Sequence, residues 1–145
     1  MVVRVLGQPR DIEEWLGRVQ LIGNVDQTTI AVAELSKAFA DRITSLGFDA
    51  EGRLHGLDDS LTRHILKHHG TFREYERGQE PISLWEISEL YKFLDLGITQ
   101  LPSVQFQKPG KNRIQTTLEV TGYTWTIIAD VRRKLVVPVT AWKKI

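Results

Sequence analysis

The spacing of apolar residues changes along this chain, from a helical period before Pro102 to a period of two after it. Before Pro102, apolar residues recur every three or four positions, which predicts amphipathic helices. Gly47 and Gly97 follow two of these stripes as expected C-caps. The expected elements of this part are a short strand at 2–6, helices at 11–19, 28–46 and 83–96, and a loop at 49–56.

Strands are predicted after Pro102, at residues 104–107, 113–120, 123–130 and 135–142. Thr121-Gly122 reads as a two-residue hairpin turn, and residues 132–134 form a second tight connection. Pro138 cannot donate a ladder hydrogen bond, so the last strand is expected at a sheet edge or with a bulge. Helices followed by an antiparallel meander define an α+β fold.

The composition is that of a globular domain. The chain has 145 residues, of which 41% are hydrophobic and 26% charged, enough for one compact domain with a real core. The absence of cysteine excludes disulfides, cysteine-ligated zinc and a thiol nucleophile. No apolar run approaches the roughly 20 residues of a membrane span, and no signal peptide begins the chain. We therefore expect a cytoplasmic protein without a membrane partner.

Charge is distributed unevenly. Residues 1–100 carry 11 basic and 16 acidic side chains, whereas residues 101–145 carry 8 basic and 2 acidic ones. A basic strand-rich region can attract a polyanion such as a nucleic acid. The alternative is a solubilising surface.

Three of the four histidines lie within the segment 61–70, which reads as one short helix capped by residues 58–60 and ended by Gly70. Helical spacing places His64 and His68 one turn apart, at the rim of the apolar stripe. His69 lies on the other side of this stripe. Side chains at this rim are held in place by packing and stay accessible to solvent, as a residue in a cleft should be.

Three interpretations of this cluster stay open. The histidines could form structural hydrogen bonds, or two of them at i and i+4 could share a metal ion. Ile65 stands where the HExxH metal helix has glutamate, and only His55 and Asp58 suggest a third ligand, so we expect no metal. The third interpretation is general acid–base chemistry on a phosphodiester.

The segment His64-Ile65-Leu66-Lys67-His68-His69-Gly70 resembles the HI-x-KHG helix of phage-encoded nuclease domains of the Barnase–EndoU–colicin–RelE-like group. Further segments resemble this family in the expected order. They are the helix and "LP" of 87–101, the Gly/basic start of a strand at 110–114, the hairpin at 122–125 and the closing "T-x-aromatic-K" strand at 135–143. The resemblance covers roughly residues 46–145.

This resemblance implies helices packed on a small, roughly four-stranded antiparallel sheet, an RNase-like meander. It also divides the chain into a helical N-terminal extension, 1–45, and a nuclease-like domain, 46–145, within one compact unit. It further implies a cofactor-free, metal-independent endoribonuclease, with tRNA as one substrate, in which the ribose 2′-hydroxyl attacks the adjacent phosphate. The implied catalytic residues are His64, His68, Arg113 and Thr140. The candidate substrate-binding residues are Lys111, Trp142 and His69 of the matched segments, together with Arg132 and Arg133, which the basic C-terminal third supplies.

Two features depart from the family pattern. His69 precedes Gly70, so either His68 or His69 can take the role of the family's second histidine, and Trp142 stands where tyrosine is more usual. The resemblance also implies a phage or prophage protein, either a toxin or a protein associated with head morphogenesis, located in the host bacterial cytoplasm or the virion. Its partners would be RNA and an immunity or inhibitor protein. The alternatives are a non-catalytic module that binds RNA or a host protein, and a metal-dependent hydrolase that uses the histidine helix.

Overall fold

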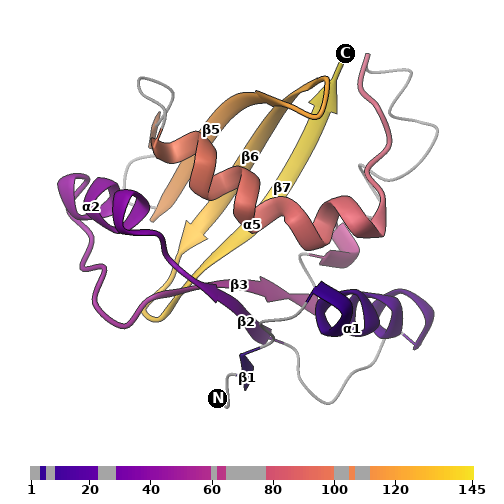
Figure 1. Cartoon of the computed structure of the whole chain (residues 1–145), viewed down its shortest axis with the longest axis horizontal. Helices are drawn as coiled ribbons and strands as arrows, with labels where there is room; N and C mark the ends of the chain where they lie inside the picture. The colour runs from indigo at the N-terminus through magenta and orange to yellow at the C-terminus, as the bar shows by residue number, and fades with distance from the viewer. Residues whose placement is uncertain are drawn as a thin grey trace.

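The computed structural model describes residues 4–5, 9–22, 29–59, 62–64, 78–99, 105–106 and 112–145. The described strands form one mixed sheet, and helices pack against it (Figure 1). The elements are β1 (Arg4–Val5), α1 (Pro9–Ile22), β2 (Thr29–Glu34), α2 (Lys37–Ser45), β3 (Leu54–Asp58), α5 (Leu84–Thr99), β4 (Gln105–Phe106), β5 (Arg113–Val120), β6 (Tyr123–Val131) and β7 (Leu135–Lys144).

The sheet has the order β1-β2-β3-β7-β6-β5-β4. Strands β5, β6 and β7 form the predicted antiparallel meander, and β2 pairs antiparallel with β3. Strand β3 joins β7 in parallel, with Leu54 opposite Leu135 and His55 opposite Val136. The α+β class is confirmed. The sheet is mixed, however, and within the described residues it has five strands of at least five residues plus two of two residues, not four antiparallel strands.

The helix predicted at 28–46 is wrong in its first half. Residues 29–34 form β2, which belongs to the sheet, so the first 45 residues are not purely helical. Helix α2 begins only after Ser36, whose hydroxyl accepts a hydrogen bond from the backbone N–H of Phe39 at 3.1 Å. Its end is as predicted, because Gly47 has a positive φ of 99° and its N–H donates to the Thr44 carbonyl.

The loop predicted at 49–56 is also too long, because β3 begins at Leu54. Glycine suits this strand at position 56, since an added Cβ would lie 2.9 Å from the Ile30 carbonyl oxygen and 3.1 Å from Leu135. The strand can therefore approach both of its neighbours closely.

The meander agrees with its sequence pattern. Thr121 and Gly122 have positive φ values of 58° and 83°, as the hairpin turn between β5 and β6 requires. Pro138 lies in β7 at a register shift, where Ile128 pairs with Thr140 but Ala129 pairs with Pro138. Strand β7 lies between β3 and β6, so the proline is accommodated by a bulge inside the sheet and not at an edge.

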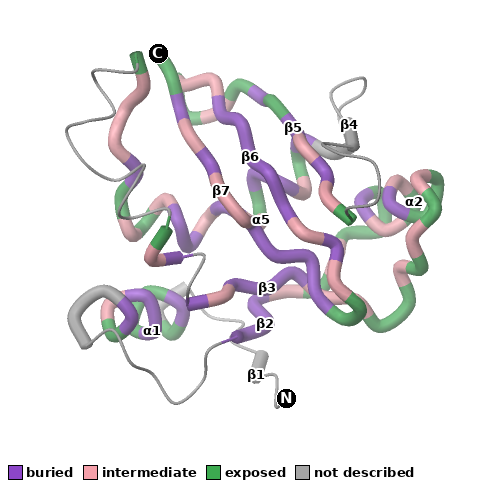
Figure 2. The backbone as a smooth tube through the Cα atoms, turned by 180° about the vertical axis from the view of Figure 1, so that it is seen from behind, coloured by how far each residue is buried: buried purple, intermediate pink, exposed green. Residues whose placement is uncertain are grey.

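Helix α5 covers one face of the meander and forms the centre of the core. Ile87, Leu90 and Leu94 are fully buried along it, and the Phe93 ring lies 5.2 Å from the ring of Trp125 on β6. Helices α1 and α2 both contact α5. Figure 2, seen from behind, shows the buried stretches of β6 and β7 with the strands in front of α5. Within the described residues, no helix is long and apolar enough to cross a membrane.

Helix α5 continues through Gly97, so the predicted C-cap there is wrong. An added Cβ at Gly97 would lie 2.6 Å from Oγ1 and 3.1 Å from Cγ2 of Thr116 on β5. We expect Gly97→Ala to lower the free energy of unfolding by about 1–3 kcal/mol, although alanine favours helices by about 1 kcal/mol. Urea denaturation measures this change. Adding Thr116→Ala should restore part of the loss, and a Gly97→Ala variant as stable as wild type would contradict the close contact.

Candidate functional site

Cross-strand pairing shows which side chains share the face of the meander that points away from α5. Thr116 lies against Gly97 of α5, so its neighbours along β5 point the other way. Residues paired directly across antiparallel strands share a face. This polar face, as we call it, carries Arg113, Gln115, Thr117 and Glu119 of β5, Thr124, Thr126, Ile128 and Asp130 of β6, and Thr140, Trp142 and Lys144 of β7.

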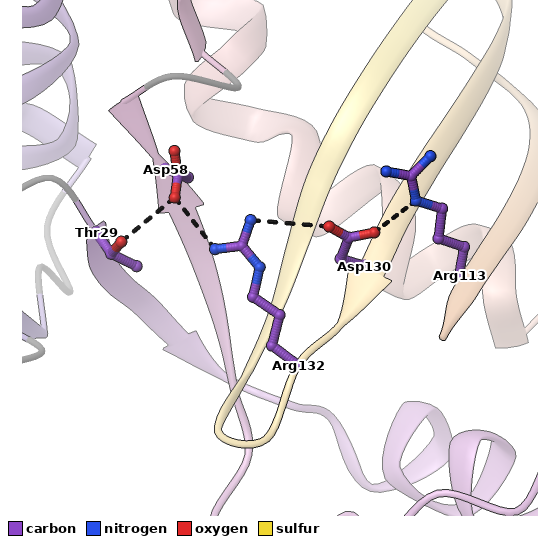
Figure 3. Close-up of polar contacts among 5 residues, drawn as sticks. All are labelled: Thr29, Asp58, Arg113, Asp130 and Arg132. Carbon is purple, nitrogen blue, oxygen red and sulfur yellow. Dashed lines mark hydrogen bonds and ion pairs between the residues drawn. The ribbon is translucent and has the colours of Figure 1, made fainter. Parts of the chain in front are cut away.

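A row of polar side chains in contact with one another begins on this face and runs from β5 and β6 to β3 and β2 (Figure 3). Arg113 Nε donates to Asp130 Oδ1 at 2.7 Å. Arg132 lies between two carboxylates, with Nη1 donating to Asp58 Oδ2 at 3.1 Å and Nη2 3.8 Å from Asp130 Oδ2. The hydroxyl of Thr29 also donates to Asp58, at 3.4 Å. These contacts therefore connect β5 and β6 to the end of β3 and to β2.

Arg132 and Arg113 differ in whether their terminal guanidinium nitrogens contact carboxylates. Both terminal nitrogens of Arg132 face carboxylates, so this side chain mainly connects the β6–β7 turn to β3. Arg113 contacts Asp130 through Nε, and its two terminal nitrogens point away from that carboxylate (Figure 3). These nitrogens have no partner among the described residues, and the side chain is 30% exposed. Arg113 thus keeps a planar pair of donors that its contact with Asp130 does not use.

Thr140 and Trp142 share the polar face with Arg113. Thr140 pairs with Ile128 and Trp142 with Thr126. Ladder spacings place the Cα atoms of Thr140 and Arg113 roughly 12 Å apart. The hydroxyl of Thr140 is buried and has no hydrogen-bond partner in the described structure, an uncommon state for a buried polar group.

The remaining predicted site residues lie elsewhere or outside the described chain. Arg133 is exposed on the turn between β6 and β7. His64 is exposed in a helical turn, residues 62–64, that follows β3. His68, His69 and Lys111 fall outside the described residues.

His55 and Asp58, the residues considered as a third metal ligand, engage other groups. His55 lies 2.8 Å from Asp95, whereas Asp58 binds Arg132. Within the described part of the chain, no three His, Cys, Asp or Glu side chains gather as a metal site would need.

The sequence did not predict a second polar cluster, which lies on the α5 side of the sheet. The buried ring of His55 on β3 contacts Asp95 on α5 through Nε2, at 2.8 Å from Oδ2. Ser36 donates to the same carboxylate twice, from its backbone N–H at 3.1 Å and from its hydroxyl at 2.5 Å. Asp95 therefore joins β3, the first residue before α2, and α5.

The hydrogen bonds decide the charge of Asp95. Burial acts to raise the pKa of Asp95, but the hydrogen bonds from His55 and Ser36 together outweigh burial and hold this pKa below its ordinary value. The carboxylate is consequently ionised near neutral pH. An open pocket of about 370 Å³ adjoins it, lined by Glu34, Ser36, Ala38, His55, Tyr91, Lys92, Asp95 and Leu96. At its rim a hydrogen bond to Glu89 raises the pKa of Lys92, which stays a paired cation.

The order of groups in this cluster does not suit nucleophilic catalysis. In a Ser-His-Asp triad the histidine lies between the other two and takes the serine proton. Here Asp95 lies between Ser36 and His55, and its lowered pKa makes it a weak base. We interpret the Ser36–Asp95–His55 cluster as a structural connection. Its one sequence signal is an acidic residue in the C-terminal half of a helix, where the dipole disfavours it.

Searches against protein-family models, curated proteins and solved structures each found no match for this chain. The fold and the two clusters define the molecule as an α+β protein with a mixed sheet, a polar face on its meander and a partly buried Ser36–Asp95–His55 cluster. The nuclease resemblance stays a prediction from sequence motifs.

Proposed function

We propose that this protein is a metal-independent endoribonuclease that binds RNA on the polar face of the meander. The observation that supports this most is the Arg113 guanidinium, which a carboxylate holds through Nε while its terminal nitrogens point away from that carboxylate (Figure 3). Arginine donors in this arrangement match two oxygens of one phosphate group. The basic composition of residues 101–145 adds to the attraction for RNA.

In the proposed reaction, the ribose 2′-hydroxyl attacks the adjacent phosphate and expels the 5′-oxygen of the next nucleotide. Arg113 stabilises the negative charge that develops on the phosphoryl oxygens. His64 and His68 act as general base and general acid, with His69 as the alternative to His68. Thr140 orients the phosphate, and Trp142 offers an aromatic surface on which a base can stack.

Around this centre, Lys111, Arg132 and Arg133 supply positive charge for neighbouring phosphates. We further propose a phage or prophage origin, tRNA as one substrate, and an immunity or inhibitor protein that protects the host cell. The protein would act in the bacterial cytoplasm or travel with the virion.

The experiment that tests this function is incubation of the purified protein with total RNA in EDTA. We expect cleavage that leaves 2′,3′-cyclic phosphate ends, because the 2′-hydroxyl is the nucleophile and no metal takes part. A His64→Ala/His68→Ala variant should lose this cleavage. Absence of cleavage, or cleavage that the double substitution leaves unchanged, would refute the nuclease. Activity that EDTA removes and zinc or manganese restores would select the metal-dependent hydrolase instead.

A second candidate is a non-catalytic RNA-binding module on the same fold. The observation that favours it is that Asp130 and Asp58 balance the charges of Arg113 and Arg132, so that the polar face is a moderate and not a strong cationic surface. A salt-dependent gel shift with intact RNA would identify this module.

A further inference from the structure

Asp130 occupies an unexpected place for an RNA-binding surface. It lies on the polar face, directly opposite Arg113 in the sheet, where its charge would repel a phosphate group. Its contacts offer a reason for this position. One carboxylate oxygen accepts from Arg113 Nε at 2.7 Å, and the other lies 3.8 Å from Arg132 Nη2.

The contact through Nε fixes the guanidinium plane of Arg113. An arginine side chain has about 2 kcal/mol of rotamer entropy, much of which a ligand would otherwise have to restrict on binding. Asp130 restricts the side chain in advance and leaves both terminal nitrogens directed away from itself (Figure 3). Arg132, itself held by Asp58, faces the second oxygen of Asp130 and so favours one orientation of the carboxylate.

We propose that Asp130 is a positioning residue, which holds the Arg113 guanidinium so that its two terminal nitrogens bind one phosphate group of RNA. This role rests on the proposed function. A positioning role and net charge predict opposite effects on RNA binding when the Asp130 charge is removed. Removing the Asp130 charge should weaken RNA binding, although the protein becomes more positive.

The test measures fluorescence anisotropy of a short single-stranded 2′-O-methyl RNA, which cannot be cleaved, in EDTA. We expect Asp130→Asn to bind about tenfold more weakly than wild type, a coupling of the size seen between contacting residues. The matched control is Glu119→Gln. Glu119 is exposed on the same face, on the neighbouring strand β5, so its neutralisation removes an equal charge and should leave binding equal or tighter.

Two further readouts separate positioning from a loss of charge. Because Asp130→Asn keeps the Arg113 charge, the slope of log affinity against log salt should stay near the wild-type slope, whereas Arg113→Gln should reduce it by about 1. The double variant Arg113→Gln/Asp130→Asn should bind no more weakly than Arg113→Gln alone, since Asp130 acts through Arg113.

Thermal unfolding of each variant shows that it is folded at the assay temperature. If Asp130→Asn does not fold, Asp130→Glu serves instead. It keeps the charge but moves the carboxylate by one methylene, so positioning predicts weaker binding and electrostatics predicts no change. Neutral or tighter binding by Asp130→Asn, with wild-type protein that binds, would overturn this role alone. A wild-type protein that does not bind RNA would overturn the proposed function and this role together.

Discussion

An Arg113→Gln variant is expected to cleave RNA about 10²–10³-fold more slowly than wild type, the usual cost of removing a donor that stabilises developing negative charge. Glutamine is polar and keeps the first three side-chain carbons, but it is shorter, carries no charge and offers one amide instead of the planar pair of terminal nitrogens. The loss should appear in kcat, because the charge on the phosphoryl oxygens grows in the transition state, and KM should rise as well, because Arg113 also binds the phosphate of uncleaved RNA. Initial rates on a fluorescently labelled RNA in EDTA, over a range of substrate concentrations, separate kcat from KM.

The matched control for this variant is Lys134→Gln. Lys134 is exposed on the β6–β7 turn, so this substitution removes the same charge without changing the polar face. We expect its kcat to stay near the wild-type value. If Arg113→Gln and Lys134→Gln reduced cleavage equally, Arg113 would contribute only general charge and the proposed centre would be misplaced.

The meander was predictable because one of its faces is polar. Along β5 the odd-numbered residues from Arg113 to Glu119 are polar and the even-numbered ones, apart from the buried Thr116, are apolar, so the sequence alternates as the side chains do. The turn residues Thr121-Gly122 then fix the register. The Arg113–Asp130 pair follows from this register, whereas the place of Thr140 and Trp142 on the same face depends on the register shift at Pro138 in β7.

Strands β2 and β3 could not be recognised in this way. Residues 29–32 of β2 are buried on both faces, with Ala31 beside Leu135 and Val137 and with Ile30 and Val32 in the main core. A short run that is buried on both faces has no period of two, and it merged with the apolar stripe of α2. The parallel pairing of β3 with β7 joins residues about 80 positions apart, and no local pattern encodes such a contact.

The Ser36–Asp95–His55 cluster was hidden for a related reason. Its members come from three elements, and each alone has an ordinary local role, such as the N-cap that Ser36 provides for α2. Only packing of α5 against β3 brings His55 and Asp95 together. The cluster's importance for stability can nevertheless be tested directly.

Replacing Asp95 by Asn is expected to lower the free energy of unfolding by about 2–4 kcal/mol near neutral pH. The carboxylate accepts hydrogen bonds from the buried His55 ring and twice from Ser36, and an amide cannot accept all three. A buried donor left without an acceptor costs about 1–3 kcal/mol, and the buried His55 ring and both Ser36 donors depend on this carboxylate. Urea denaturation of wild-type and variant protein over a series of pH values measures this difference.

The pH dependence tests whether the charge of Asp95 is responsible. The pKa of Asp95 is lower in the folded chain than the roughly 3.9 of an aspartate in an unfolded one. Its contribution is therefore fully present above that unfolded value and is lost as the pH falls through the lower folded value. The stability gap between wild type and Asp95→Asn should thus narrow below about pH 4. Asp41→Asn, an exposed aspartate on α2, should change stability by less than about 0.5 kcal/mol at any pH. A gap for Asp95→Asn that stays constant in acid would show that side-chain shape, and not the ionised carboxylate, holds β3, α2 and α5 together.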